Sequence, residues 1–196
     1  MFNHTAYPRT GRRVALGLIL EKATGSSLAD LIQDRIAKPL GLTDTYLAGP
    51  ARGDFVDATW INDSTEWAAG GVVSTAADWA RFQTALISGK LLPPALLAEM
   101  ETTVSEGADT ANRYGLGLER VVTPCGAVWG HVGQVPGYSS ENYTDDTGRR
   151  TVAVFATTIF SLAEPMAAQA NQNLINAAVC TMLDKPIPAS AVTSVP

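Results

Sequence analysis

The stretch from 114 to 158 constrains the fold more than any other part of the chain. In order it contains Tyr-Gly-Leu-Gly-Leu at 114–118, Cys125, Trp-Gly-His-Val-Gly at 129–133, Pro-Gly-Tyr at 136–138 and Thr-Val-Ala-Val-Phe-Ala at 151–156. The apolar segment that enters the Gly-flanked His131 and the later β-branched run have the composition of strands, and Pro-Gly marks a turn between them. We therefore predict adjacent antiparallel strands over 127–134, 138–144 and 150–158, with His131 on the first.

The composition places these strands in an ordinary globular protein. The chain has 196 residues, of which 46% are hydrophobic and 17% charged, which is enough for one sizeable core. The net charge is -5 and the basic residues are scattered, so we expect no nucleic-acid partner. No apolar run is long enough to span a membrane, and the first seven residues do not resemble a signal peptide. Any export signal therefore lies outside this chain.

Helical periodicity flanks the predicted strands. We predict helices over 14–23, 27–36, 75–88, 93–104 and 166–183. The first is apolar nearly all round, which favours burial on most of its faces. In the last, Met166, Leu174 and Met182 recur at helical spacing, with Ile175 and Val179 beside them, so this helix should cover the sheet. The fold class is therefore α+β, with residues 1–185 in one domain or part of one.

Two segments lack such periodicity. Residues 43–71 are rich in Asp, Thr, Gly and Pro with isolated aromatic residues, which predicts a long irregular segment. Beyond Lys185 the tail 186–196 has no period and several prolines, so we expect it to be disordered.

The two cysteines, Cys125 and Cys180, are too few for the usual four-ligand metal site. The residues alone leave open whether they pair or remain separate buried thiols. If they pair, the chain-entropy estimate gives a stabilisation on the order of 4 kcal/mol, and an oxidising compartment is implied.

Five segments, taken in order and spacing, resemble the serine β-lactamase and penicillin-binding-protein superfamily, especially class C β-lactamases and secreted D-Ala-D-Ala carboxypeptidases. They lie at 17–25, 39–45, 69–75, 114–118 and 130–133, the last followed by Pro-Gly-Tyr at 136–138. The resemblance covers roughly 14–186. It implies an α/β sandwich, in which helices flank an antiparallel sheet, and acyl transfer on D-Ala-D-Ala peptides, β-lactams or esters, with no metal and no cofactor.

The carboxypeptidase branch also resembles this chain in having cysteines where Cys125 and Cys180 stand. The resemblance therefore implies a disulfide between them and an extracellular or periplasmic protein with a peptidoglycan-type substrate.

The superfamily nucleophile is the serine of Ser-x-x-Lys, where the Lys activates an otherwise weak hydroxyl. No serine in this chain has a lysine three positions later. The superfamily places that motif upstream of the segment matching 14–23, together with two or more strands. We therefore interpret the chain as the C-terminal part of such a hydrolase, inactive alone, with a bare sheet edge or face that favours self-association. The alternative is a non-catalytic remnant that acts as a binding module.

A second superfamily motif, Tyr-x-Asn, should fall just before Val14. Ungapped counting puts Pro8 at the Tyr position and Thr10 at the Asn position, with Tyr7 one residue early. Tyr7 is therefore our candidate for the proton-shuttling tyrosine, in a degraded motif.

The His-x-Gly strand supplies the other candidate site residues. The resemblance implies that His131 shapes the electrostatics near the substrate carboxylate, and that the N–H of Gln134 completes an oxyanion hole. Gly133 allows close backbone approach. Val132 and Trp67 are candidates for the substrate-binding wall.

Each of these assignments has a plainer alternative. His131 is alternatively a half-exposed strand histidine with no role, and Trp67 a core aromatic. We expect the Thr-Asp-Thr run at 43–45 and the Tyr114 run to be structural.

Overall fold

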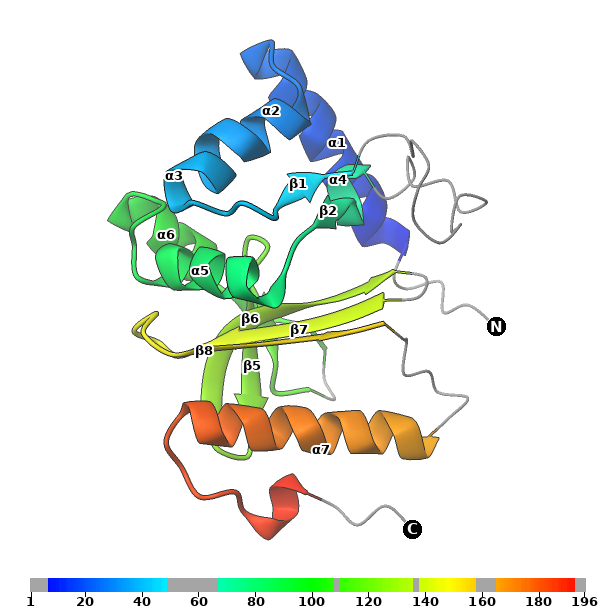
Figure 1. Ribbon diagram of the computed structural model, residues 1–196, viewed down its shortest axis with the longest axis vertical. Coiled ribbons are helices and arrows are strands. Elements are labelled where there is room, and N and C mark those ends of the chain that lie inside the picture. Colours follow the sequence, from blue (N-terminus) through cyan, green and yellow to red (C-terminus); the bar gives the residue numbers. More distant parts are fainter. Residues whose placement is uncertain (1–6, 49–66, 108–109, 136–137, 158–164, 193–196) are drawn as a thin grey trace. The chain divides into compact units, whose positions relative to one another are not determined.

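The computed structural model describes residues 7–48, 67–107, 110–135, 138–157 and 165–192 (Figure 1). The chain divides into two compact units, Met1–Asp78 and Trp79–Pro196. The helices are α1 (Tyr7–Thr24), α2 (Leu28–Ile32), the π-helical segment η1 (Gln33–Ala37), α3 (Lys38–Leu40), α4 (Trp67–Gly70), α5 (Ala76–Ile87), α6 (Pro94–Glu101), α7 (Pro165–Met182) and the 3-10 turn η3 (Ala189–Ala191). The strands are β1 (Tyr46–Leu47), β2 (Val72–Val73), β3 (Val104–Ser105), β4 (Arg113–Tyr114), β5 (Glu119–Thr123), β6 (Gly126–Val135), β7 (Tyr138–Thr144) and β8 (Thr151–Ala156).

In the first unit, the helix predicted over 27–36 begins with a side-chain cap. The Ser27 hydroxyl oxygen accepts the Asp30 backbone N–H at 3.1 Å, which begins α2. The helix continues through η1 into α3 and ends at Gly41, whose φ of 64° is the left-handed conformation that glycine adopts without strain.

Helix α1 does not have the burial that its composition predicts. Leu16, Leu18, Ile19 and Leu20 are each at least 47% exposed. The packed side of α1 includes Gly17, where an added Cβ would lie 2.7 Å from the Ala68 Cβ on α4. Because this contact occupies one stripe of the helix, the other apolar side chains have no cover within the described part of the unit.

Asp78 organises the end of the irregular segment. Its carboxylate, which is fully buried, accepts the Asp44 backbone N–H at 2.9 Å and the Thr45 hydroxyl at 2.9 Å. The Thr75 hydroxyl oxygen in turn accepts the Asp78 N–H at 3.2 Å. The run 43–45 therefore has a structural role, as predicted. Residues 49–66 of the predicted irregular segment lie outside the described residues.

The second unit is built on a six-stranded antiparallel sheet in the order β3-β4-β5-β6-β7-β8. The three predicted strands correspond to β6, β7 and β8, and β6 and β7 pair from Trp129–Thr144 to Val135–Tyr138. The predicted α+β class, with helices flanking an antiparallel sheet, is confirmed. Residue 158, the predicted end of the last strand, lies outside the described part.

Helix α7 covers one face of this sheet, as Figure 1 shows. Val128 on β6 packs with Tyr143 on β7 and with Ile175 and Val179 on α7, and all four side chains are at most 5% exposed. Of the apolar positions predicted to face the sheet, Ile175, Val179 and Met182 pack on this core. The prediction is wrong for Met166 and Leu174, whose side chains are 57% and 55% exposed. The helix is rotated by about one position, so Ile175 and Val179 point at the sheet.

Helix α5 lies over the opposite face, where the contacts are more polar. The Thr84 and Thr151 hydroxyl oxygens are 3.1 Å apart, and Thr151 also contacts the Thr144 hydroxyl at 3.0 Å. Asn142 and Thr144 point to this face and are at most 1% exposed.

A disulfide joins Cys125, before β6, to Cys180 near the end of α7, with a Cα–Cα distance of 5.3 Å. This pairing is confirmed. The first part of the tail, expected to be disordered, lies against it: Ala191 is 1% exposed in a cluster with the two cysteines. Asn176 donates to the Ala191 carbonyl at 3.0 Å. The buried Ala191 side chain and the hydrogen bond from Asn176 hold this part of the tail in place. Its composition has no helical or strand period from which this could be predicted.

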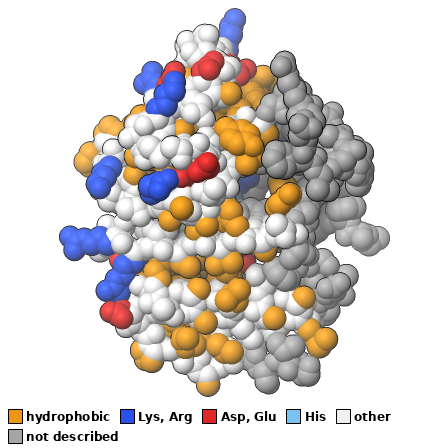
Figure 2. Space-filling view, in the orientation of Figure 1, with side chains coloured by type: hydrophobic (Ala, Val, Ile, Leu, Met, Phe, Trp, Pro, Cys, Tyr) orange, Lys and Arg blue, Asp and Glu red, His pale blue; other side chains and the backbone are white. Residues whose placement is uncertain are grey.

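Strand β8 is at one end of the strand order, and within the described residues its only strand partner is β7. Phe155 on β8 is 39% exposed. In Figure 2, hydrophobic side chains are visible over the region of α7 and the strands beside it, which agrees with the exposure of Met166 and Leu174.

Candidate active site

His131 lies on β6, on the face of the sheet opposite α7. Side chains alternate along a strand, and Val128 points at α7, so positions 131 and 133 point to the other face. The continuous β6–β7 register excludes a bulge that would reverse this alternation. His131 is half-buried.

Tyr114 contacts His131, although its strand, β4, is separated from β6 in the sheet by β5. The Tyr114 hydroxyl oxygen lies 3.0 Å from Nε2 of His131, and the two rings meet edge to face with centroids 5.7 Å apart. The other ring nitrogen, Nδ1, lies 2.5 Å from the Val132 carbonyl oxygen. Both nitrogens of the imidazole therefore have hydrogen-bond partners.

The contact is not among the predictions from the sequence, which give the Tyr114 run a structural role. Tyr114 pairs with Glu119, and Glu119 pairs with Gly130, the neighbour of His131 on β6. Only the folded sheet brings β4 to the strand that bears His131.

The half of β6 that carries His131 has an open edge. Strand β5 pairs with β6 only from Gly126 to Gly130. Among the described strands, residues 131–135 pair on the β7 side alone. Within the described residues, this edge of β6 from 131 to 135 therefore has no second strand beside it.

Gly133 is required by its neighbour on β7. A Cβ added at Gly133 would lie 2.6 Å from the Ser140 hydroxyl oxygen, closer than real Cβ contacts. Gly133 and Ser140 are register partners, so the missing side chain lets the two strands pair with Ser140 on the His131 face. Gln134 follows with an exposed side chain that points to the α7 face.

The face of the sheet that carries His131 also carries the positively charged side chain of Arg120. The Arg120 guanidinium lies 4.7 Å from the centroid of the Trp129 ring, and it forms an ion pair with Asp146. A cation over an aromatic face is stabilised by the ring quadrupole.

Tyr7 and Trp67 belong to the first unit and are described apart from the His131 strand. Tyr7 is the first residue of α1; its side chain lies outside the described part. Trp67 begins α4 and is half-buried, and its indole would lie 3.1 Å from a Cβ added at Gly17. Its packing against α1 is that of a structural aromatic.

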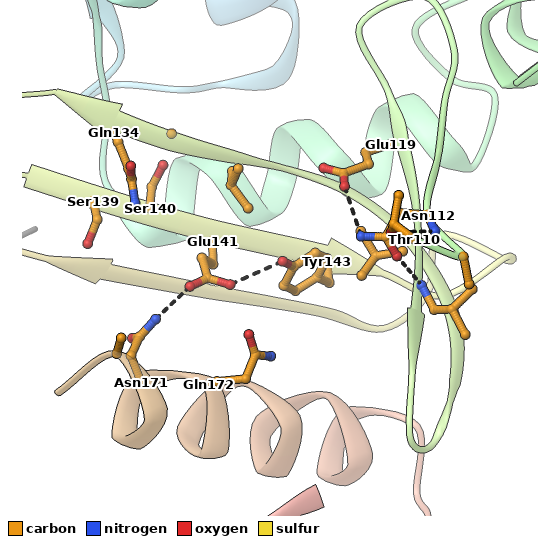
Figure 3. Close-up of a pocket in the computed structure, with 16 residues that line it drawn as sticks. Thr110, Asn112, Glu119, Gln134, Ser139, Ser140, Glu141, Tyr143, Asn171 and Gln172 are labelled. Carbon is orange, nitrogen blue, oxygen red and sulfur yellow. Dashed lines mark hydrogen bonds between the residues drawn. The ribbon is translucent and has the colours of Figure 1, made fainter. Parts of the chain in front are cut away.

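A cavity of about 580 Å³ lies on the other face of the sheet, between β5–β7 and α7 (Figure 3). Val132 and Gln134 line it, whereas His131 does not. Glu141 in this cavity accepts the Asn171 side-chain N–H at 2.7 Å and the Tyr143 hydroxyl at 3.1 Å. Burial, followed by the nearby Glu141 carboxylate, raises the pKa of Tyr143 well above its ordinary value.

The lining of this cavity is acidic. Glu119 and Glu141 are its charged residues, and Glu119 accepts the Asn112 amide at 3.3 Å. Gly133 and Gln134 of the candidate site line this cavity, whereas the side chain of His131 points to the opposite face.

The described residues show neither a cluster of metal-binding side chains nor a helix of membrane-spanning length. No group of three or more His, Cys, Asp or Glu side chains is placed to hold a metal ion. None of the described helices is long and apolar enough to cross a bilayer.

The fold and the His-x-Gly strand define a protein of the β-lactamase type. The sequence matches the family Beta-lactamase over residues 4–176, and the chain belongs to this family.

Solved structures agree. A D-stereospecific amidohydrolase from Streptomyces sp. is 31% identical over 76% of this chain and 49% of its own, with a TM-score of 0.70. The D-amino acid amidase from Ochrobactrum anthropi SV3, complexed with L-phenylalanine amide, is 25% identical over 89% of this chain and 55% of its own, with a TM-score of 0.67. An octameric penicillin-binding protein homologue from Pyrococcus abyssi, at 22% identity, shares the fold over 93% of this chain and 43% of its own, with a TM-score of 0.69. This chain thus spans about half the length of the structures that it matches.

Proposed function

We propose that this chain forms the His131 side of the substrate cleft in a serine hydrolase, and that residues 1–185 are part of one such domain. The reaction is acyl transfer from an amide, β-lactam or ester to a serine, followed by hydrolysis. Family membership and the open edge of β6 beside His131 carry this proposal. The enzyme names of two neighbours support a substrate whose acyl group has D configuration, such as a D-amino acid amide or a D-Ala-D-Ala peptide.

The residues on β6 have distinct roles in this proposal. His131 sets the electrostatics beside the substrate, and Gly133 admits the substrate backbone. The N–H of Gln134 is one donor of the oxyanion hole, where preorganised N–H groups stabilise the developing charge. Val132 contributes through its main chain, since its side chain faces the cavity beside α7.

Two residues of the first unit are further candidates in this proposal: Tyr7 for proton transfer and Trp67 for contact with the substrate. The indole contact with α1 supports a structural role for Trp67 as well.

The chain is inactive by itself in this proposal, because acyl transfer needs a nucleophile with an adjacent base and no Ser-x-x-Lys is present. The same observation favours a second candidate, a non-catalytic module that binds the same ligands. A disulfide is most stable in an oxidising compartment, which supports an extracellular or periplasmic location.

Among the described strands β8 pairs on one side alone, which supports self-association, because a free strand edge presents unpaired N–H and C=O groups. Sedimentation of the chain should show a dimer that forms with rising concentration, and Phe155→Lys should weaken it. A monomer at all concentrations would contradict self-association.

The function is tested by joining to this chain a segment that carries Ser-x-x-Lys, taken from a member of the superfamily, and by installing Tyr-x-Asn through Pro8→Tyr and Thr10→Asn. The chimaera should hydrolyse D-phenylalanine amide in preference to the L enantiomer. His131→Gln should lower kcat/KM by about tenfold or more, while the control Tyr46→Phe, at an exposed position, should not. A folded chimaera that binds penicillin without covalent reaction would instead support the binding module.

A further inference from the structure

The hydrogen bonds of His131 restrict its proton to one nitrogen. A carbonyl oxygen can only accept, so the 2.5 Å contact between Nδ1 and the Val132 carbonyl places a hydrogen on Nδ1. In the neutral ring Nε2 is then unprotonated and accepts, and the Tyr114 hydroxyl 3.0 Å away is a donor. The neutral Nε2–H tautomer does not fit these two contacts.

We propose that Tyr114 is a positioning residue for His131: its hydroxyl donates to Nε2 and holds the neutral imidazole in the Nδ1–H tautomer. In water a histidine side chain favours the Nε2–H form, so the preferred tautomer is reversed here. Which nitrogen carries the proton is set by the hydrogen bond that the other nitrogen makes.

The loop after Tyr114 explains how a tyrosine on β4 reaches β6. The Gly115 N–H donates to the Leu118 carbonyl at 2.7 Å, and Gly117 has φ 78°, so the chain reverses tightly into β5. A Cβ at Gly115 would lie 2.1 Å from the Met100 carbonyl oxygen, which requires glycine there. The Tyr-Gly-Leu-Gly run therefore sets β4 against β5, and the Tyr114 ring meets the His131 ring edge to face.

The hydrogen bond between Tyr114 and His131 limits what each side chain can do in a reaction. The Nε2 lone pair is already used, so His131 does not act as a free general base, and its hydrogen bond orients the Tyr114 hydroxyl. That consequence for catalysis rests on the proposed function, whereas the tautomer rests on the two hydrogen bonds alone.

The test is ¹⁵N NMR of the chain labelled at histidine, at about pH 9, well above the ordinary histidine pKa. The chain has two histidines, and a His131→Gln spectrum assigns the signal of His131. The wild-type ring should show a protonated Nδ1 and an unprotonated Nε2. In Tyr114→Phe, the loss of one hydrogen bond should shift the tautomer ratio toward Nε2–H by about threefold to tenfold.

Tyr46→Phe is the matched control, because it removes a hydroxyl from an exposed tyrosine of the first unit; it should leave the ratio unchanged. Amide spectra check that each variant is folded. A wild-type ring in the Nε2–H form would overturn the proposal without needing any variant, as would an unchanged ratio in folded Tyr114→Phe. Neither result bears on whether the chimaera described above hydrolyses amides, so the two proposals fail separately.

Discussion

The Tyr114 hydroxyl oxygen lies 3.0 Å from Nε2 of His131, although the residues are 17 positions apart and their strands are separated in the sheet by β5. Two successive strand pairings bring Tyr114 to the level of Gly130, the neighbour of His131 on β6. It makes the geometry of His131 depend on the packing of the second unit, so the stability of that unit bears on the site.

The packing of α7 against the sheet is tested by two neighbouring positions. Ile175→Ala removes a side chain that is 3% exposed and packed on Val128 and Tyr143, so it should lower the free energy of unfolding by about 2–5 kcal/mol. Leu174→Ala, at a side chain 55% exposed, should change it by about 0.5 kcal/mol or less. Urea denaturation followed by circular dichroism measures both. Equal effects would mean that α7 is rotated differently.

The disulfide should leave no titratable thiol when the chain is unfolded without reductant, and two after reduction, because Cys125 and Cys180 are paired. Replacing both with Ala should lower the free energy of unfolding by about 2–4 kcal/mol. A thiol titration that finds two groups before reduction would contradict the pairing.

Asp145, in the turn between β7 and β8, makes stability depend on pH. Partial burial disfavours its charge, but hydrogen bonds from the Thr147 hydroxyl and from the backbone N–H groups of Arg149, Arg150 and Thr147 outweigh burial and lower the pKa of Asp145 below the ordinary 3.8. The folded state therefore binds this proton less readily than the unfolded state. The stabilisation is present above the ordinary pKa and is lost as pH falls through the lower, folded-state value.

Asp145→Asn should accordingly be less stable than the wild type at neutral pH, and the difference should shrink as the pH falls below 3.8. Asp184→Asn removes the same charge from an exposed side chain and serves as the control. Thermal unfolding across this pH range measures the effect. A difference that stays constant with pH would show that Asp145 contributes no linked proton.

The sequence predicted those features that depend on local patterns. Strand-like composition and the Pro-Gly signal located the strands around His131, and helical periodicity located the helix that begins after Ser27. Neighbouring apolar positions on one helix, Leu174 and Ile175, carry no local sign of which one faces the sheet. The composition of α1 likewise did not predict that one apolar side of the helix is exposed, because burial depends on which elements pack against it.

In the candidate site, too, some residues could be predicted from local motifs and others could not. His131 and Gly133 were identified by their motif, whereas the contact with Tyr114 required the register of three strands. The acidic cavity beside α7 was also missed, because Glu119, Glu141 and Asn171 come from separate elements with no shared motif.

The most direct test of the central claim is the intact mass of the protein after incubation with a fluorescent penicillin. In the proposed function the chain carries one wall of the cleft, and it has no Ser-x-x-Lys nucleophile, so its mass should not change. The folded chimaera with Ser-x-x-Lys and Tyr-x-Asn should gain the mass of one penicillin. An adduct on the chain itself, or no adduct on the folded chimaera, would contradict this account.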